Sequence, residues 1–199
     1  MTSVARWVEV HRLAVAGREA GIARDAGGRV CRVWLARSRF ADAARLAGLT
    51  LTLGEDALAL YQLGWAKDAT GDPTAALAAY DRALRLYRAA GNRAGEAVTL
   101  SNIGAVYDGL GDRQRALECF GQALLVTLEV GDRAREAVTR FNVAMIHRDQ
   151  GDLGRAVAEL EQVVELDRQV GHSDLQFDAE TLDRVRQELA SSDRDRGSP

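Results

Sequence analysis

Apolar residues in the segment 91–130 recur every three or four positions and form two separate stripes. The first stripe contains Ala97, Leu100, Ile103, Gly104 and Tyr107. The second stripe contains Ala116, Leu117, Phe120, Ala123, Leu124 and Leu128. This spacing is typical of amphipathic helices that bury one face. Gly111 and Asp112 lie between the stripes and supply a helix-ending residue and an N-cap, so the segment predicts a helical hairpin.

The same pattern returns along the chain with a period of forty residues. Gly91 aligns with Gly131 and Gly171 at this spacing, and Asn102 aligns with Asn142. Self-similarity at one fixed period indicates an array of stacked repeats in which each repeat contacts its neighbours. We therefore expect one array of helical hairpins, without separate domains of different folds.

The pattern divides the chain into segments. Residues 1–22 predict a helix that resembles the second helix of an incomplete repeat, and Ser173 and Gln176 form a capping-box pattern before a helix at 173–190. This last helix has a polar outer side that includes Asp178, as a terminal cap requires. The polar tail 191–199 is expected to be disordered. The hairpins between them are predicted at 23–55, 56–91, 92–131 and 132–171.

These residues resemble the tetratricopeptide repeat, whose pattern is W-x2-L-G-x2-Y followed by A and then F. The matching positions of the central copy are Leu100, Ile103, Gly104, Tyr107, Ala116 and Phe120. The forty-residue spacing is similar to the longer variant in kinesin light chain and in C-terminal arrays of bacterial signal-transduction ATPases and antibiotic-pathway regulators. The resemblance implies an all-α fold, a right-handed α-solenoid of stacked antiparallel hairpins with a C-terminal capping helix. Lys67 and His147 depart from the pattern, since they replace the tyrosine.

The resemblance also implies a function, because the first helices of such hairpins line a concave face on which a peptide or protein lies. Helical periodicity around the conserved glycine then selects the side chains that point into this groove. The candidate groove residues are Arg29, Arg32, Tyr61, Gln62, Trp65, Asn102, Asp108, Phe141, Asn142, Met145 and Arg148. A regulatory scaffold or sensor of a bacterial system is the setting that the resemblance favours.

Gln62, Asn102 and Asn142 stand at the same place in three hairpins and predict a ladder of amides. In the kinesin light chain type of repeat, asparagines at this place hold the ligand backbone, and an amide suits that role with its two donors and one acceptor. The alternative is that these amides bond to the neighbouring helix. Likewise, Trp65 and Phe141 either supply apolar pockets for a ligand or pack between hairpins.

Composition narrows the function classes. The formal net charge is −3 with both signs mixed, so the basic surface of a nucleic-acid-binding protein is not expected. No apolar run reaches the roughly 18 residues that span a bilayer, so we expect no membrane partner and a cytoplasmic location. The three histidines are dispersed, and Cys31 and Cys119 lie far apart. Neither a catalytic constellation nor a metal or cofactor site is expected, and the cysteines are interpreted as small packing residues.

The N-terminal helix leaves an apolar edge formed by Trp7, Val10 and Leu13. An array that begins in mid-repeat must cover this edge with a partner or a second copy, or it was cut from a longer chain. A homodimer formed through this edge is therefore the alternative to peptide binding.

Overall fold

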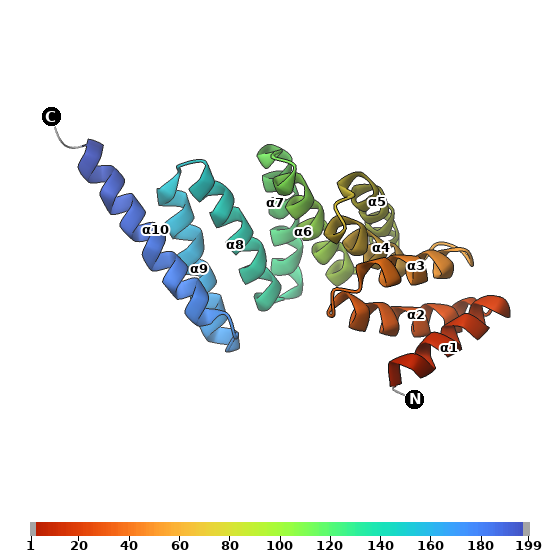
Figure 1. Cartoon of the computed structure of the whole chain (residues 1–199). Coiled ribbons are helices and arrows are strands. Elements are labelled where there is room, and N and C mark those ends of the chain that lie inside the picture. The colour runs from red at the N-terminus through yellow and green to blue at the C-terminus, as the bar shows by residue number, and fades with distance from the viewer. Residues whose placement is uncertain (1–2, 197–199) are drawn as a thin grey trace. The chain divides into compact units, whose positions relative to one another are not determined.

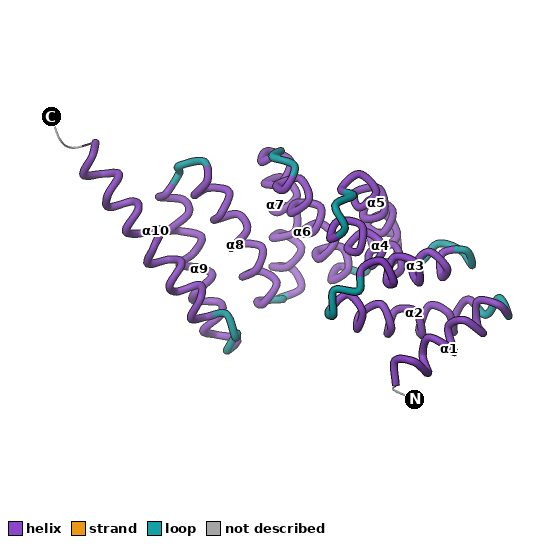
Figure 2. The backbone as a smooth tube through the Cα atoms, in the orientation of Figure 1, coloured by secondary structure: helices purple, strands orange, loops and turns teal. Residues whose placement is uncertain are grey.

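A computed structural model describes residues 3–196, and this part of the chain consists of helices joined by short turns, without a strand (Figures 1 and 2). The predicted all-α class is confirmed. None of the described helices is long and apolar enough to cross a membrane. The helices are α1 (Ser3–Ala16), α2 (Ala20–Leu35), α3 (Phe40–Leu51), α4 (Ala57–Ala69), α5 (Pro73–Ala89), α6 (Arg93–Gly109), α7 (Arg113–Val130), α8 (Arg133–Asp149), α9 (Leu153–Val170) and α10 (Leu175–Arg196). They belong to two compact units, residues 1–95 and residues 96–199.

A glycine followed by an aspartate punctuates the helices as the sequence predicts. Gly111 has φ +79° and Gly131 has φ +70°, a left-handed conformation that glycine adopts without a steric penalty. The next residue then caps the following helix: Asp112 Oδ1 accepts the amide of Arg115 at 3.2 Å. Each turn thus ends one helix and begins the next within a few residues.

The first two turns of the chain use other residues. Arg18 (φ 59°) and Ser38 (φ 55°) occupy the left-handed region without being glycine. As a result α1 ends at Ala16 and α2 begins at Ala20, inside the segment 1–22 that the sequence assigned to one helix. The apolar residues keep their helical spacing across this turn, and no Gly-Asp pair indicates that a helix ends there.

In the first unit, α1 packs on α2 and α3. Val4, Trp7 and Val8 lie against a buried cluster that includes Trp34 and Leu46. Cys31 belongs to the same cluster at 1% exposure, its thiol donates to Ala43 O at 3.5 Å, and burial raises the pKa of Cys31 to about 12. The interpretation of Cys31 as a packing residue is confirmed. A second cluster of this unit, built on Leu60, Ala83 and Tyr87, joins α4 to α5.

In the second unit, Phe120 on α7 is 1% exposed and packs against Val143 and Ile146 on α8. A Cβ atom added to Gly104 would lie 2.8 Å from Phe120 Cε1, so the glycine of the repeat lets α6 approach this ring. The last core cluster joins α8, α9 and α10 through residues that include Leu160 and Val185. Successive helices of this unit are therefore joined by successive clusters of buried side chains.

Helix α10 differs from its prediction at both ends and on one face. Ser173 lies outside the helix, and its hydroxyl donates to Asp174 Oδ1, so the predicted capping box is absent at this position. The helix continues to Arg196, so residues 191–196 of the expected disordered tail are helical, while 197–199 lie outside the described residues. Asp178, expected on the outer polar side, is only 7% exposed because it faces α9.

Candidate functional site

Helices α6 and α8 of the second unit are joined by a buried pair of hydroxyl groups. Ser101 Oγ and Thr139 Oγ1 lie 3.0 Å apart, and both side chains are at most 9% exposed. Asn102 follows Ser101 on α6, so this contact fixes the helix turn that carries it. The Thr139 hydroxyl donates to Arg135 O at 2.9 Å, so its oxygen accepts the hydroxyl of Ser101 and both buried groups have a partner.

Two neighbouring cavities open on this face. The α6–α8 cavity has a volume of about 240 Å³, and its lining includes Ser101, Asn102 and Arg135. The acidic cavity has a volume of about 160 Å³ and lies between α8 and α10. Val138 and His172 line both cavities. The lining of the acidic cavity consists of Ala137, Val138, Phe141, Asn142, Asp167, His172, Asp174, Phe177 and Asp178.

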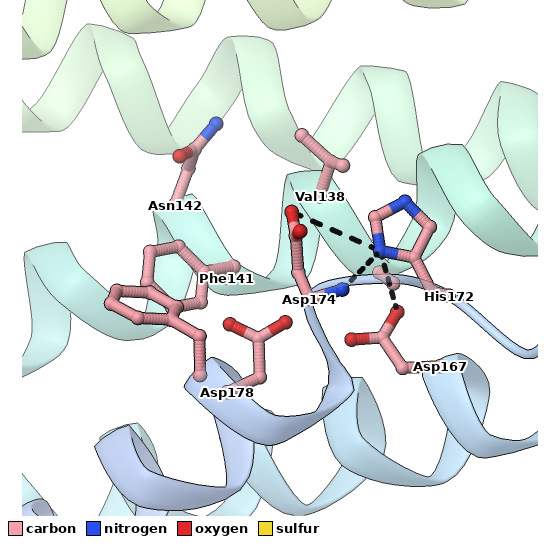
Figure 3. Close-up of a pocket in the computed structure, with 9 residues that line it drawn as sticks. Val138, Phe141, Asn142, Asp167, His172, Asp174 and Asp178 are labelled. Carbon is pink, nitrogen blue, oxygen red and sulfur yellow. Dashed lines mark hydrogen bonds and ion pairs between the residues drawn. The ribbon is translucent and has the colours of Figure 1, made fainter.

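His172 connects the acidic groups of the second cavity, as Figure 3 shows. Its Nδ1 atom accepts the backbone amide of Asp174 at 3.3 Å. The same atom lies 4.0 Å from Asp167 Oδ1 and 3.9 Å from Asp174 Oδ2. The cavity thus gathers three carboxyl groups around one imidazole ring.

Asp167 and Asp178 form the floor of the acidic cavity at 1% and 7% exposure. Burial, together with a hydrogen bond to Asp167 and the negative charges of Asp167 and Asp174, raises the pKa of Asp178 to about 7, while His172 opposes the shift. Two adjacent carboxyl groups out of water resist ionising together, since each negative charge disfavours the other. The carboxyl group of Asp178 therefore keeps its proton to a higher pH than an exposed aspartate does.

The predicted groove residues of the first unit have different environments. Gln62 is 4% exposed and its side-chain amide donates to Gly28 O at 3.1 Å, which is the alternative that the sequence left open. Trp65 is 40% exposed and lies beside the half-buried ring of Tyr61, at 6.5 Å between centroids. Arg29 and Arg32 are exposed, and Arg29 bonds to Asp25 and stacks on Trp7.

In the second unit, the structure brings three of the predicted residues to the two cavities. Asn102 lines the α6–α8 cavity, and Phe141 and Asn142 line the acidic cavity. The others lie elsewhere. Met145 packs against the core of α8, α9 and α10, and Arg148 forms a two-pronged ion pair with Glu188 at 2.5 and 2.9 Å. Asp108 is exposed and lines neither cavity.

Sequence reasoning missed the residues that α9 and α10 contribute to the acidic cavity. The position of these residues relative to the apolar stripe of each helix could have indicated them. Asp167 continues the stripe of Leu160 and Val163, and Asp178 precedes Leu182 by one helical turn. A carboxyl group on a buried stripe is unusual enough to mark a site.

Among the described residues, no group of three or more His, Cys, Asp and Glu side chains is placed to hold a metal ion. The two cavities together present the amides of Asn102 and Asn142, the rings of Phe141 and Phe177, and the buried carboxyl groups of Asp167 and Asp178.

Comparison with known proteins places the repeats in a family. A family model described as tetratricopeptide repeat matches residues 55–126 and 95–169, which together cover more than half of the chain. No protein of curated function matches the sequence significantly.

Several solved structures share the fold at low sequence identity. The apo form of RapI is 16% identical with a TM-score of 0.70; the match covers 83% of this chain and 50% of that one, so this chain spans half the length of RapI. BtubC from P. vanneervenii is 15% identical with a TM-score of 0.66, covering 96% and 93%. A putative kinesin light chain from Podospora anserina is 14% identical with a TM-score of 0.67, covering 85% and 88%.

Proposed function

Because this chain belongs to the tetratricopeptide repeat family, we propose that it is a non-enzymatic module that binds a protein or peptide partner along α6 and α8 of its second unit. The observation that carries the proposal is the placement of two amides. Asn102 and Asn142 lie one repeat period apart and line neighbouring cavities that share Val138 and His172. An extended peptide that crosses both cavities would meet both amides along its backbone.

Specificity would come from the remaining groups of the face. Phe141 and Phe177 offer apolar contact, and Arg135 lines the α6–α8 cavity while it pairs with Asp132 at 3.0 Å. In the first unit, the exposed ring of Trp65 stays a predicted contact, because large exposed aromatic side chains are common anchors of interfaces. The setting that we propose, a scaffold or sensor in a bacterial regulatory system, rests on the resemblance of the forty-residue repeat to such arrays.

The proposal is tested by selecting peptides from a random library on the immobilised full chain and measuring their affinities in solution. The double substitution Asn102→Ala and Asn142→Ala removes two hydrogen bonds of about 1 kcal/mol each, so we expect affinity to fall about tenfold or more. Fluorescence anisotropy of a labelled selected peptide gives the two dissociation constants.

A matched control removes two amides outside this face. Gln114 and Gln169 are exposed on α7 and α9 and bond only to Glu118 and Glu165 in the structure. Replacing both with alanine should leave affinity within about a factor of two, as expected for surface positions. Unchanged affinity in the Asn102 and Asn142 variant, with helicity intact by circular dichroism, would disprove the role of these amides.

A second candidate function is self-association through α1 of the first unit. Leu13 is 55% exposed and Val10 is 36% exposed, although Trp7 is half-buried against the core. Val10 and Trp7 also line a cavity at this edge. Adjacent apolar side chains on a surface mark an interaction site more often than isolated ones do.

A further inference from the structure

One buried carboxylate oxygen of the acidic cavity receives no hydrogen bond while both acids are ionised. Asp167 is 1% exposed and its Oδ2 atom is buried without a donor, so the protonated carboxyl group of Asp178 is the neighbour that can donate to Asp167. In Figure 3 one oxygen of Asp167 is joined to His172, and the other points toward the carboxyl group of Asp178. An ionised carboxylate only accepts hydrogen bonds, so two facing carboxylates leave both oxygens without a donor.

This arrangement requires a positive group or a proton between the two carboxyl groups. An unpaired buried charge is costly, and native proteins neutralise it or pair it. The charged and titratable groups around Asp178 are Asp167 on α9 and His172 and Asp174 in the turn. The lining residues of α8 are uncharged, so the cavity has an excess of negative charge.

The walls of the cavity suit an organic cation. The rings of Phe141 and Phe177 lie 6.1 Å apart at 40°, and Phe177 is 57% exposed although it adjoins the buried acids. Aromatic faces attract guanidinium and ammonium groups, and a planar guanidinium can bond to carboxylates through two parallel N–H groups. The described residues lack a cluster fit for a metal ion, which favours a side chain of the partner.

We propose that the acidic cavity takes a basic side chain of the bound peptide, an arginine above all, whose cation replaces the proton between Asp167 and Asp178. The released proton passes to solvent, and the cation supplies the donor that Asp167 Oδ2 lacks once Asp178 is ionised. This inference rests on the proposed function and names the chemical preference of one position of the partner.

The test is a titration of the isotope-labelled full chain with N-acetyl-argininamide, followed by amide chemical shifts. We expect shifts that cluster at the residues lining the acidic cavity, with a dissociation constant on the order of millimolar for so small a ligand. N-acetyl-lysinamide should bind more weakly, because an ammonium group lacks the two parallel donors. The neutral isostere N-acetyl-citrullinamide should give no cluster of shifts.

Binding should also depend on pH with a fixed sign. Below its pKa of about 7 Asp178 holds a proton that the cation must displace, so affinity should be about tenfold weaker at pH 6 than at pH 8. His172 also gains charge if it is protonated, so His172→Gln is measured in parallel. The pH dependence should persist in that variant if the carboxyl pair causes it.

Two substitutions on one helix separate the site from its surroundings. Asp178→Asn removes a carboxylate of the pair and should weaken argininamide binding about tenfold or more, as loss of a charged hydrogen bond does. Asp183→Asn makes the same change of charge on the exposed side of α10, where Asp183 lies 3.7 Å from Arg186, and should leave binding unchanged. If Asp178→Asn fails to fold, Phe177→Ala at an exposed position should still weaken binding.

Three results would overturn the inference: equal shifts with citrullinamide, wild-type affinity in a folded Asp178→Asn chain, or equal affinity at pH 6 and pH 8. The peptide library shows whether only the inference about the basic side chain fails or whether the proposed peptide binding fails as well. Selected peptides that need Asn102 and Asn142 but contain no basic residue would refute the cavity's preference and leave peptide binding standing. If argininamide binds but the library yields no peptide, the cavity's preference for a basic group stands and the proposed peptide binding fails.

Discussion

At the scale of single residues, an aromatic ring lies over the glycine of the preceding helix in two of the hairpins. Phe120 covers Gly104, and Tyr80 covers Gly64 in the first unit, where an added Cβ atom would lie 2.7 Å from the ring. Both rings are 1% exposed. The repeat pattern marked Gly104 and Phe120 as matching positions of the central copy, and the structure shows that these two positions meet across the hairpin.

The packing of Phe120 predicts a large loss of stability on truncation. Phe120→Ala leaves a cavity against Val143 and Ile146, so we expect the free energy of unfolding to fall by about 3 to 5 kcal/mol. Leu125→Ala on the same helix, at 65% exposure, should change it by no more than about 0.5 kcal/mol. Urea denaturation of both variants makes the comparison, and a loss below about 1 kcal/mol for Phe120→Ala would contradict the register of the hairpin.

Polar residues were less predictable than apolar ones. Gln62, Asn102 and Asn142 occupy one repeat position, yet Gln62 is 4% exposed and bonds to Gly28 O, whereas Asn102 and Asn142 are half-buried beside cavities. Periodicity places the three amides at one repeat position but does not report which groups surround each of them. The contact between Asp167 and Asp178 could not be predicted either. The helical pattern gives the face of each helix on which an acid lies, but not that the two acids meet.

At the scale of elements, the ends of the helices were predictable wherever glycine and aspartate mark them. The turns at Arg18 and Ser38 were not, since these residues take a left-handed conformation that their side chains disfavour. Helix α10 extends to Arg196 although its sequence becomes polar after Ala190. The predicted helix boundaries were therefore wrong where no glycine or capping residue marks the end of a helix.

Two glycines of the second unit should respond in opposite directions to the same substitution. Gly111 has φ +79° with open space around it, so Gly111→Ala should lower the free energy of unfolding by about 1 kcal/mol through backbone strain alone. Gly121 lies exposed inside α7 with no atom near an added Cβ, so Gly121→Ala should raise it by about 0.5 to 1 kcal/mol. Thermal or urea unfolding of the two variants decides, and the same sign in both would contradict this account of the turn.

At the scale of the whole molecule, the apolar edge of α1 makes the oligomeric state a direct test of the second candidate function. If copies pair through Leu13, sedimentation equilibrium at high concentration should give twice the 21.6 kDa of one chain. Leu13→Asp should then restore the mass of a single chain, since a charge buried in an apolar contact is costly. Leu128→Asp on α7, at a similar exposure of 53%, should leave the mass unchanged. A wild-type chain that stays monomeric would exclude pairing through this edge.

The aspartates that begin α7, α8 and α9 have one further property in common. Each accepts the amide of the arginine three positions later and also pairs with its guanidinium group, at 3.3, 3.0 and 3.2 Å for Asp112, Asp132 and Asp152. The capping hydrogen bond and the ion pair of such a turn therefore lie within four consecutive residues. A gene segment of forty codons that is duplicated in place carries its own start and stop signals for every helix it encodes. We therefore expect that a hairpin can be inserted or removed while the turns of the remaining hairpins stay intact.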